Sequence, residues 1–271
     1  MDLEKKIGFI GAGNIAYSIV KGLIDQFSNI QENIYISNRT FEKAQVFHED
    51  FGVHPERSNV DVIKKCDIIL LTTKPDVYKH VLKEIKEYIR EDQIIVSIAA
   101  GISIDYIEDF FSQPRKIVRT MTNTSVLVGE GMTALTPNSQ VSNEELEDVC
   151  QIFKSIGKVD VIKEEHLDVV ASISASSPAY VYMFIEALAD GGVLEGMPRK
   201  KAYQYAAQAV LGAAKMILET GKHPGELKDM ICSPAGITIE AVYALERNHF
   251  RASIIEAMEV CTAKSKKLVN K

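Results

Sequence analysis

The sequence predicts two domains of different class, an α/β domain followed by an all-helical domain. Short β-rich runs alternate with helical stretches over residues 1–162. Such alternation favours a parallel sheet with helices packed on both of its faces. Residues 163–271 instead show long helical patterns with no β-rich run between them. The boundary between the two domains is therefore predicted near residue 162.

Apolar and β-branched runs mark the strands of the first domain. Asp67–Thr73 and Gln93–Ala99 are almost wholly apolar, as strands buried on both faces should be. Three further runs are predicted as strands, namely Lys6–Ile10, Asn33–Ser37 and Lys116–Met121. Apolar residues at helical spacing predict the helices Asn14–Phe27, Thr40–Phe51 and Val77–Ile89.

The second domain is predicted from helical periodicity and from prolines near several helix starts, where a missing N–H costs little. Ser176-Ser177-Pro178 is expected to break the chain between two of these helices. Alanine and glycine are frequent in this half, so its helices can approach one another closely. The predicted helices are Glu165–Ser174, Ala179–Leu194, Lys200–Thr220, Gly225–Ile231, Ile237–Arg247 and Phe250–Leu268.

Composition limits the partners and the compartment. The formal net charge of −6 gives no electrostatic case for nucleic acid or for an anionic membrane. The four cysteines form no Cys-x-x-Cys pair, which argues against a zinc site and a disulfide framework and suits a reducing cytosol. No apolar run approaches the length of a membrane span, and the N-terminus lacks the apolar stretch of a signal peptide. We therefore predict a cytoplasmic protein with no metal, no membrane and no nucleic-acid partner.

A glycine-rich turn follows the first predicted strand. Gly11-Ala12-Gly13-Asn14-Ile15-Ala16 matches the G-x-G-x-x-A fingerprint of dinucleotide-binding turns. Gly11 permits a tight turn, Gly13 lets the backbone approach a pyrophosphate, and Ala16 lets the next helix pack on the strand. The helix N-terminus would face the phosphates. This predicts a Rossmann-like domain that binds a dinucleotide, and a helical domain behind such a domain is often a dimerisation module.

The residues after the second predicted strand bear on the choice of cofactor. Enzymes that use NAD usually place an acidic residue there to bind the ribose hydroxyls. The sequence instead reads Ser37-Asn38-Arg39-Thr40. A guanidinium with small polar neighbours suits a 2′-phosphate, because it can pair with it bidentately. We therefore predict NADPH as the preferred cofactor. NADH stays an open alternative, in which Arg39 is a solvated residue before a helix.

An ordered set of motifs runs through both domains, and the set is specific although no single member is. The stretches in the first domain are Ile7–Ala16, Asn38-Arg39, Lys74-Pro75, Ser97–Gly101 and Arg119–Ser125. Those in the second domain are Ser174–Tyr180, Glu186–Gly196, Ala213–Met216 and His223–Glu240. On these motifs the chain resembles the pyrroline-5-carboxylate reductases, which catalyse the last step of proline biosynthesis, over essentially its full length.

The resemblance implies hydride transfer from NAD(P)H to the cyclic imine 1-pyrroline-5-carboxylate, which gives L-proline. It also implies a helical domain that interlocks with its twofold mate in a homodimer, often within a ring of dimers. The implied cofactor contacts are Ile10, Gly11, Ala12, Gly13, Asn14, Ile15, Asn38, Arg39, Asn59, Thr72, Thr73, Lys74, Pro75, Ile98, Ala99 and Ala100. The implied substrate contacts are Glu164, Ser233, Gly236, Ile237 and Thr238.

Reduction of an imine needs hydride delivery to carbon while the nitrogen is, or becomes, protonated. Because the nicotinamide supplies the hydride, the protein has to orient the substrate, bind its carboxylate and supply a proton or hydrogen bond. The loop Ser233–Thr238 precedes a predicted helix and offers free N–H groups to a carboxylate. Thr238 would place its hydroxyl near the ring nitrogen and is the candidate catalytic residue, with orientation as its first role. Without a substrate, Ser233 and Thr238 would be ordinary N-caps.

The chain departs from the family pattern in three loops. Thr122 and Ser125 replace two prolines, so that loop is expected to be less rigid. Ala175 and Ser177 replace two glycines, and Ala235 replaces a glycine in the loop for the carboxylate. The methyl group of Ala235 matters if that position requires a positive φ.

Two other functions stay open. A related dehydrogenase of the β-hydroxyacid type would normally carry a catalytic Lys in the first long helix of the second domain, and residues 165–194 contain none. A non-catalytic NADP-binding dimer is favoured only by the loop substitutions, while the intact Gly236 and Thr238 argue against it.

Overall fold

The computed structural model describes residues 5–268. Within this range the chain forms two compact units, the first with residues 5–175 and 261–268 and the second with residues 176–260. The division thus falls after Ala175, and the end of the last helix belongs to the first unit. The boundary expected near residue 162 stays a prediction, since it rests on the change in sequence pattern.

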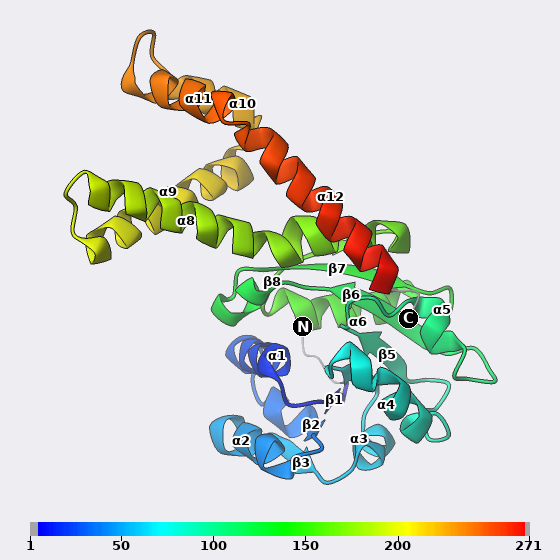
Figure 1. The fold of residues 1–271 in the computed structure, drawn as a ribbon. Coiled ribbons are helices and arrows are strands. Elements are labelled where there is room, and N and C mark those ends of the chain that lie inside the picture. The colour runs from blue at the N-terminus through cyan, green and yellow to red at the C-terminus, as the bar shows by residue number, and fades with distance from the viewer. Residues whose placement is uncertain (1–4, 269–271) are drawn as a thin grey trace. The chain divides into compact units, whose positions relative to one another are not determined.

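The first unit is built around one eight-stranded sheet (Figure 1). Its spatial order is β3-β2-β1-β4-β5-β6-β7-β8, with every neighbouring pair parallel except β6 and β7. The order reverses between β1 and β4, which is where open α/β sheets bind ligands. The strands are Ile7–Ile10 (β1), Ile34–Ser37 (β2), His54–Glu56 (β3), Ile68–Leu71 (β4), Ile94–Ser97 (β5), Lys116–Met121 (β6), Gly131–Pro137 (β7) and Gly157–Val161 (β8).

Strand alternation divides the core into one layer on each face of the sheet. Ile68 and Leu70 of β4 belong to a cluster with α1, α2 and α6, whereas Ile69 and Leu71 belong to a cluster with α3, α4 and α5. Figure 1 shows α1 and α2 on one side of the strands and α3 and α4 on the other. The helices are Asn14–Gln26 (α1), Phe41–Phe51 (α2), Asn59–Lys65 (α3), Tyr78–Ile85 (α4), Ile104–Glu108 (α5), Asn143–Lys154 (α6) and Leu167–Val170 (α7).

The predicted class, a Rossmann-like domain followed by a helical one, is confirmed, and all five predicted strands are present. The structure adds β3, β7, β8, α3, α5 and α6, which the sequence analysis did not predict. β3 has only three residues and includes Pro55, which a strand tolerates at the edge of a sheet. α6 begins with a capping box between Ser142 and Glu145, a sequence signal that could have found it.

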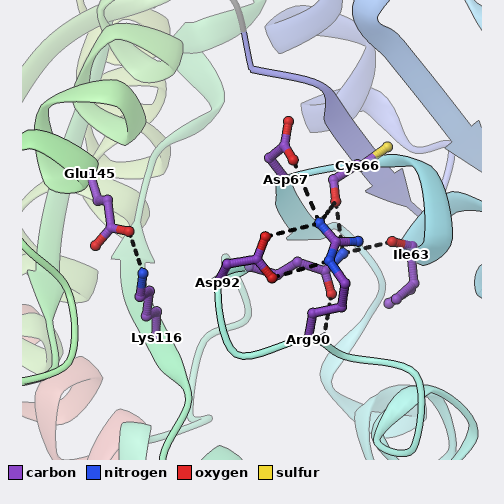
Figure 2. Close-up of polar contacts among 8 residues, drawn as sticks. Ile63, Cys66, Asp67, Arg90, Asp92, Lys116 and Glu145 are labelled. Carbon is purple, nitrogen blue, oxygen red and sulfur yellow. Dashed lines mark hydrogen bonds and ion pairs between the residues drawn. The ribbon is translucent and has the colours of Figure 1, made fainter.

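A polar cluster fixes the amino ends of β4 and β5 (Figure 2). The fully buried Gln93 donates from Nε2 to the carbonyl oxygens of Ile63 (2.6 Å) and Cys66 (2.7 Å). Arg90 pairs with Asp92 through Nε at 3.1 Å and also donates to the Cys66 carbonyl at 3.5 Å. Because Cys66 precedes β4 and Gln93 precedes β5, these bonds hold the starts of two neighbouring strands, and the carboxyl end of β4 borders the site described below.

Helices are the regular elements of the second unit, short loops connect them, and α8 and α9 pack against each other. The expected break at Ser176–Pro178 is wrong, because Ala171–Ser176 form a π-helix and α8 begins directly after it with Pro178 in its first turn. The helices are Ser177–Leu194 (α8), Arg199–Thr220 (α9), Pro224–Met230 (α10), Ile237–Arg247 (α11) and Phe250–Leu268 (α12).

The second unit has almost no core of its own. Among residues 176–260 only Ala189, Ala202 and Ala206 are buried. Large apolar side chains are left exposed, including Leu218 at 84% and Ile237 at 91%. Exposed apolar area on this scale marks an interaction surface. No described helix combines the length and the apolar character that crossing a membrane requires.

Candidate active site

A cavity of about 670 Å³ lies at the carboxyl ends of β1, β2, β3 and β4, within the first unit. The glycine turn forms one wall. Gly11 has a φ of +115°, and a Cβ there would lie 2.9 Å from the backbone carbonyl carbon of Thr72. Gly13 is the N-cap of α1, has no capping side chain, and faces open space where a Cβ would stand. The turn therefore leaves room against uncapped helix N–H groups, as a phosphate requires.

The cavity brings together many of the residues expected to contact a cofactor. Those that line it are Ile10, Gly11, Ala12, Gly13, Asn38, Arg39, Asn59, Thr72, Thr73 and Lys74. Six others are not among its described lining residues, namely Asn14, Ile15, Pro75, Ile98, Ala99 and Ala100. Asn14 and Ile15 open α1, Pro75 opens a short 3₁₀ turn after β4, and Ile98–Ala100 follow β5, so all six lie at the same edge of the sheet.

Ten lining residues were not predicted as cofactor contacts, although Ser37 and Thr40 were noted as small polar neighbours of Arg39. They are Ser37, Thr40, Lys43, Arg57, Ser58, Asp76, Val77, His80, Val81 and Glu84. Arg57 and Ser58 were missed because β3 was not predicted, so nothing indicated that the chain returns to the sheet edge at this point. Lys43 and Thr40 lie beside the predicted Arg39 and could have been found from that neighbourhood.

Two asparagines organise the cavity wall through their amides. The Ala12 N–H donates to Asn38 Oδ1 at 3.2 Å, and Asn38 Nδ2 donates to the Thr40 carbonyl at 2.9 Å. Asn59 accepts from Ser37 Oγ at 2.7 Å and donates to Glu84 Oε2 at 2.8 Å. These bonds connect the ends of β1, β2 and β3 with α4. They also engage the Glu84 carboxylate at the cavity wall.

Neighbouring hydroxyls after β4 have different roles. Thr72 Oγ1 donates to the Gly11 carbonyl at 2.6 Å and so supports the glycine turn. Thr73 Oγ1 is buried, lines the cavity and has no hydrogen-bond partner in the structure. A buried hydroxyl without a partner is costly unless a ligand or water satisfies it. With the open cradle at Gly13, this orphaned group fits a dinucleotide bound along the wall.

Tyr78 stabilises the same edge of the sheet through its hydroxyl. Its hydroxyl donates to the Leu71 carbonyl at 2.6 Å and accepts from Ser97 Oγ at 3.2 Å, which joins the ends of β4 and β5. Burial raises the pKa of Tyr78 to about 12, so the phenol stays protonated and neutral. Burial likewise raises the pKa of Cys66 to about 12, so this thiol is not a nucleophile at neutral pH.

Glu164, a predicted substrate contact, is held by a buried cation. Arg119 on β6 is only 3% exposed and donates from Nη1 to Glu164 Oε1 at 2.8 Å. The Ile104 N–H donates to the same oxygen at 2.9 Å. The Glu164 side chain remains 31% exposed, so its carboxylate is oriented by two donors and still accessible. Nε and Nη2 of Arg119 are buried without a partner in the structure.

The loop before α11, in the second unit, forms a turn closed by the Gly236 N–H and the Ser233 carbonyl at 3.0 Å. Gly236 is the N-cap of α11 and carries no capping side chain, so the alternative in which Ser233 or Thr238 is the N-cap is wrong. Ala235 adopts a φ of +57°, the left-handed conformation that favours glycine. The N–H groups at the start of α11 are therefore free of side-chain caps.

The loop with the two missing prolines is tied by side chains. Thr122 Oγ1 and Thr133 Oγ1 lie 2.8 Å apart, and both residues are buried. Asn123 donates to Ser174 Oγ at 3.2 Å and accepts from the Met132 N–H at 3.3 Å. A threonine pair thus supplies restraint that a proline would otherwise provide through its fixed φ.

Comparison with known proteins connects these features to a family. A pyrroline-5-carboxylate reductase of Escherichia coli is 48% identical to the chain over 98% of it and 99% of the relative, and one of Methanosarcina acetivorans is 38% identical over 99% of both. The chain belongs to the pyrroline-5-carboxylate reductase family. The family model described as pyrroline-5-carboxylate reductase dimerisation matches residues 164–268, and that described as NADP oxidoreductase coenzyme F420-dependent matches residues 6–101.

Solved structures agree with this assignment. A pyrroline-5-carboxylate reductase of Coxiella burnetii superposes with a TM-score of 0.92 at 32% identity, over 97% of the chain and 98% of that protein. The Plasmodium falciparum enzyme, solved with NADP bound, superposes at 0.87 with 33% identity, over 99% of the chain and all of that protein. The chain is thus an oxidoreductase with pyrroline-5-carboxylate reductase function, it uses NADP(H), and it acts on a small molecule as an oligomer.

The ion pair of this reductase predicts an asymmetry in stability. Glu164→Ala leaves the buried Arg119 guanidinium without its anion, so we expect it to lower the free energy of unfolding by about 3 kcal/mol. Arg119→Met leaves a carboxylate that water can reach, and we expect a loss of roughly 1–2 kcal/mol. Glu164→Gln keeps an acceptor oxygen and should lie closer to the wild type. Urea unfolding measures all three, and equal losses for the first two variants would contradict the interpretation.

The backbone of Ala235 predicts a stabilising substitution. Ala235→Gly relieves the left-handed strain and should raise the free energy of unfolding by about 0.5–1 kcal/mol, after the flexibility that glycine adds to the unfolded chain is subtracted. Gly221→Ala is the matched reverse change, because Gly221 has a φ of +64° and no atom within 4 Å of its Cβ position. It should cost a similar amount. The idea fails if Ala235→Gly destabilises the protein in urea.

Proposed function

We propose that NADPH binds along the cavity of the first unit and reduces 1-pyrroline-5-carboxylate to L-proline, the last step of proline biosynthesis. The observation that carries the cofactor site is the joint presence of the open cradle at Gly13, the uncapped start of α1 and the orphaned hydroxyl of Thr73. The proposed contacts are those predicted from the sequence, including the six residues at the same sheet edge that do not line the cavity.

The pyrophosphate would lie against Gly11–Gly13, where its oxygens would accept hydrogen bonds from the first N–H groups of α1. Arg39 is the proposed partner of the 2′-phosphate, because no acidic residue occupies positions 37–40 at the end of β2. Thr73 and Lys74 follow β4 and line the cavity. The buried Thr73 hydroxyl, which has no partner in the structure, can form a hydrogen bond with the cofactor. The preference for NADPH over NADH is a proposal that rests on Arg39.

The substrate carboxylate is assigned to the loop before α11. Ser233, Gly236, Ile237 and Thr238 are the proposed contacts there, supported by the uncapped N–H groups at the helix start. Glu164 is the proposed contact from the first unit, supported by its oriented and accessible carboxylate. A substrate carboxylate at α11 would satisfy donors that the fold otherwise leaves to water.

The reduced cofactor supplies a hydride to the imine carbon, and the ring nitrogen gains or keeps a proton. The chain contributes binding and orientation, because none of its groups has to form a covalent bond. Thr238 lies in the first turn of α11, one residue after the helix begins, and its hydroxyl is the proposed hydrogen-bond partner of the ring nitrogen. An unperturbed threonine is a poor acid, so its main role is to hold the imine for attack.

The assembly and the location are further parts of the proposal. A homodimer through residues 163–271 is supported by the dimerisation model, which begins at residue 164, and by the exposed apolar side chains of the second unit. A ring of dimers is the proposed higher assembly, by analogy with the family. A cytoplasmic location is supported by the four cysteines, because no disulfide joins any of them within the described residues.

The activity is tested by the loss of NADPH absorbance with pyrroline-5-carboxylate as substrate. We expect turnover by the wild type and a fall of about 100-fold in kcat/KM for Thr238→Ala, since the hydroxyl orients the reacting nitrogen. Thr238→Ser keeps the hydroxyl and should retain most of the activity. An inactive wild type would refute the reaction, and an unaffected Thr238→Ala variant would refute the assignment of Thr238.

The assembly is tested by sedimentation velocity on the full chain. We expect a mass that is an even multiple of the 30.1 kDa chain, because the apolar side chains of the second unit need a partner surface. The thermal midpoint should also rise with protein concentration, since association stabilises the folded state by mass action. A monomer at micromolar concentration would contradict the dimer, and a dimer that grows no further would contradict the ring.

A further inference from the structure

Arg57 lies at the carboxyl edge of the sheet beside the residues that follow β2. β2 and β3 pair in parallel, with Ser37 opposite Glu56. The next residues in register are Asn38 and Arg57, and both line the cavity. The short strand β3 therefore places a second guanidinium at the part of the cavity where Arg39 lies.

A ring supports this guanidinium. The Cζ atom of Arg57 lies 4.4 Å from the centroid of Phe41, the first residue of α2. Stacking on an aromatic face holds an arginine by its flat surface and leaves its N–H groups free at the edge. Phe41 follows Arg39 and Thr40 directly, so the support for Arg57 comes from the same turn that presents Arg39.

Neither guanidinium is neutralised within the described chain. The side chains of Arg39 and Arg57 make no hydrogen bond or ion pair with any residue between 5 and 268. The nearby Glu56 is engaged by Lys65 at 2.6 Å. Glu84, an acid of the cavity wall, is engaged by Asn59. The lining holds four cations, with Lys43 and Lys74 beside the two arginines, against the two acids Asp76 and Glu84. No ion pair joins any of these cations to an acid within the described residues, so the lining has an excess of positive charge.

We infer that Arg57 is a second specificity-determining residue for NADPH and shares the 2′-phosphate with Arg39. The inference rests on the proposed binding of NADPH in this cavity. A phosphate monoester carries close to two negative charges at neutral pH and offers three acceptor oxygens, which suits two guanidinium groups. NADH has a neutral hydroxyl at this position and would leave the cations unneutralised. Arg57 therefore favours NADPH by attraction and disfavours NADH through the charge it leaves unpaired.

Equilibrium binding tests this directly and does not depend on turnover. Titration calorimetry with NADPH, NADH, 2′,5′-ADP and 5′-AMP would compare the wild type with Arg39→Ala, Arg57→Ala and the double variant. We expect Arg57→Ala to weaken NADPH and 2′,5′-ADP about tenfold, the value of one charge-assisted hydrogen bond at a partly solvated site, and to leave NADH and 5′-AMP unchanged. The loss should shrink at high salt.

Conservative variants separate charge from stacking. Arg57→Lys keeps the charge and loses the planar fork, and Phe41→Leu removes the ring beneath the guanidinium, so both should give intermediate losses for 2′,5′-ADP. Arg115→Ala is the matched control, because Arg115 also stacks on an aromatic ring, that of Phe111 at 5.7 Å, and does not line the cavity. It should change no affinity. Thermal midpoints would show that each variant is folded.

The outcomes separate a failure of the assigned role of Arg57 from a failure of the proposed NADPH site. If Arg39→Ala lowers the preference for NADPH and Arg57→Ala does not, Arg57 has no role and the binding proposal stands. If Arg57→Ala weakens NADPH and NADH equally, its role is structural and the inference is overturned. If neither variant changes the NADPH preference, the assignment of Arg39 fails as well.

Discussion

Three contacts close the glycine turn after β1, and the cavity depends on them. The Gly11 N–H donates to the Ser37 carbonyl at the end of β2 (2.9 Å), while the Thr72 N–H donates to the Ile10 carbonyl (3.0 Å) and Thr72 Oγ1 to the Gly11 carbonyl (2.6 Å). A Cβ at Gly11 would meet the Thr72 backbone, so only glycine permits this closure. The start of α1 and the polar residues after β2 and β4 take their positions from it. The part of the cavity that the glycine turn forms is thus fixed mainly by backbone hydrogen bonds.

The two units bury their apolar side chains in different ways. The first unit covers both faces of its sheet with its own helices, so β1 and β4 consist of buried residues at every position and carry no polar side chain. The second buries only three alanines and exposes tyrosine, methionine, leucine and isoleucine side chains. The second unit therefore depends on association for its stability, because it has no complete core of its own. The same unit carries the proposed carboxylate loop, so the oligomer and the substrate site depend on the same helices.

The sequence predicted what strong local patterns encode. β4 and β5 were found because burial on both faces leaves an unbroken apolar run, and the glycine turn because its spacing has a steric cause. β3 was missed because three residues with a proline carry no strand signal, and Arg57 was missed with it. The π-helix at Ala171–Ser176 has no local signature that separates it from a break. The loop Ser233–Thr238 has the local pattern of a helix start, which allows a carboxylate site and ordinary N-caps alike, and the resemblance favoured the carboxylate site.

The turn before α11 combines strain with an uncapped helix. Ala235 keeps the left-handed backbone although it is not glycine, and a Cβ at Gly236 would lie 2.2 Å from Ser233 Oγ. The surrounding chain thus holds Ala235 in its left-handed conformation, and the turn closes at Gly236 because this residue has no side chain. An N-cap serine or aspartate would satisfy the first N–H groups of α11 and stabilise it by about 1 kcal/mol. Backbone strain beside unsatisfied donors is a combination found at ligand sites, because a bound anion can offset both. The left-handed backbone of Ala235, kept although the residue is not glycine, therefore supports the carboxylate role.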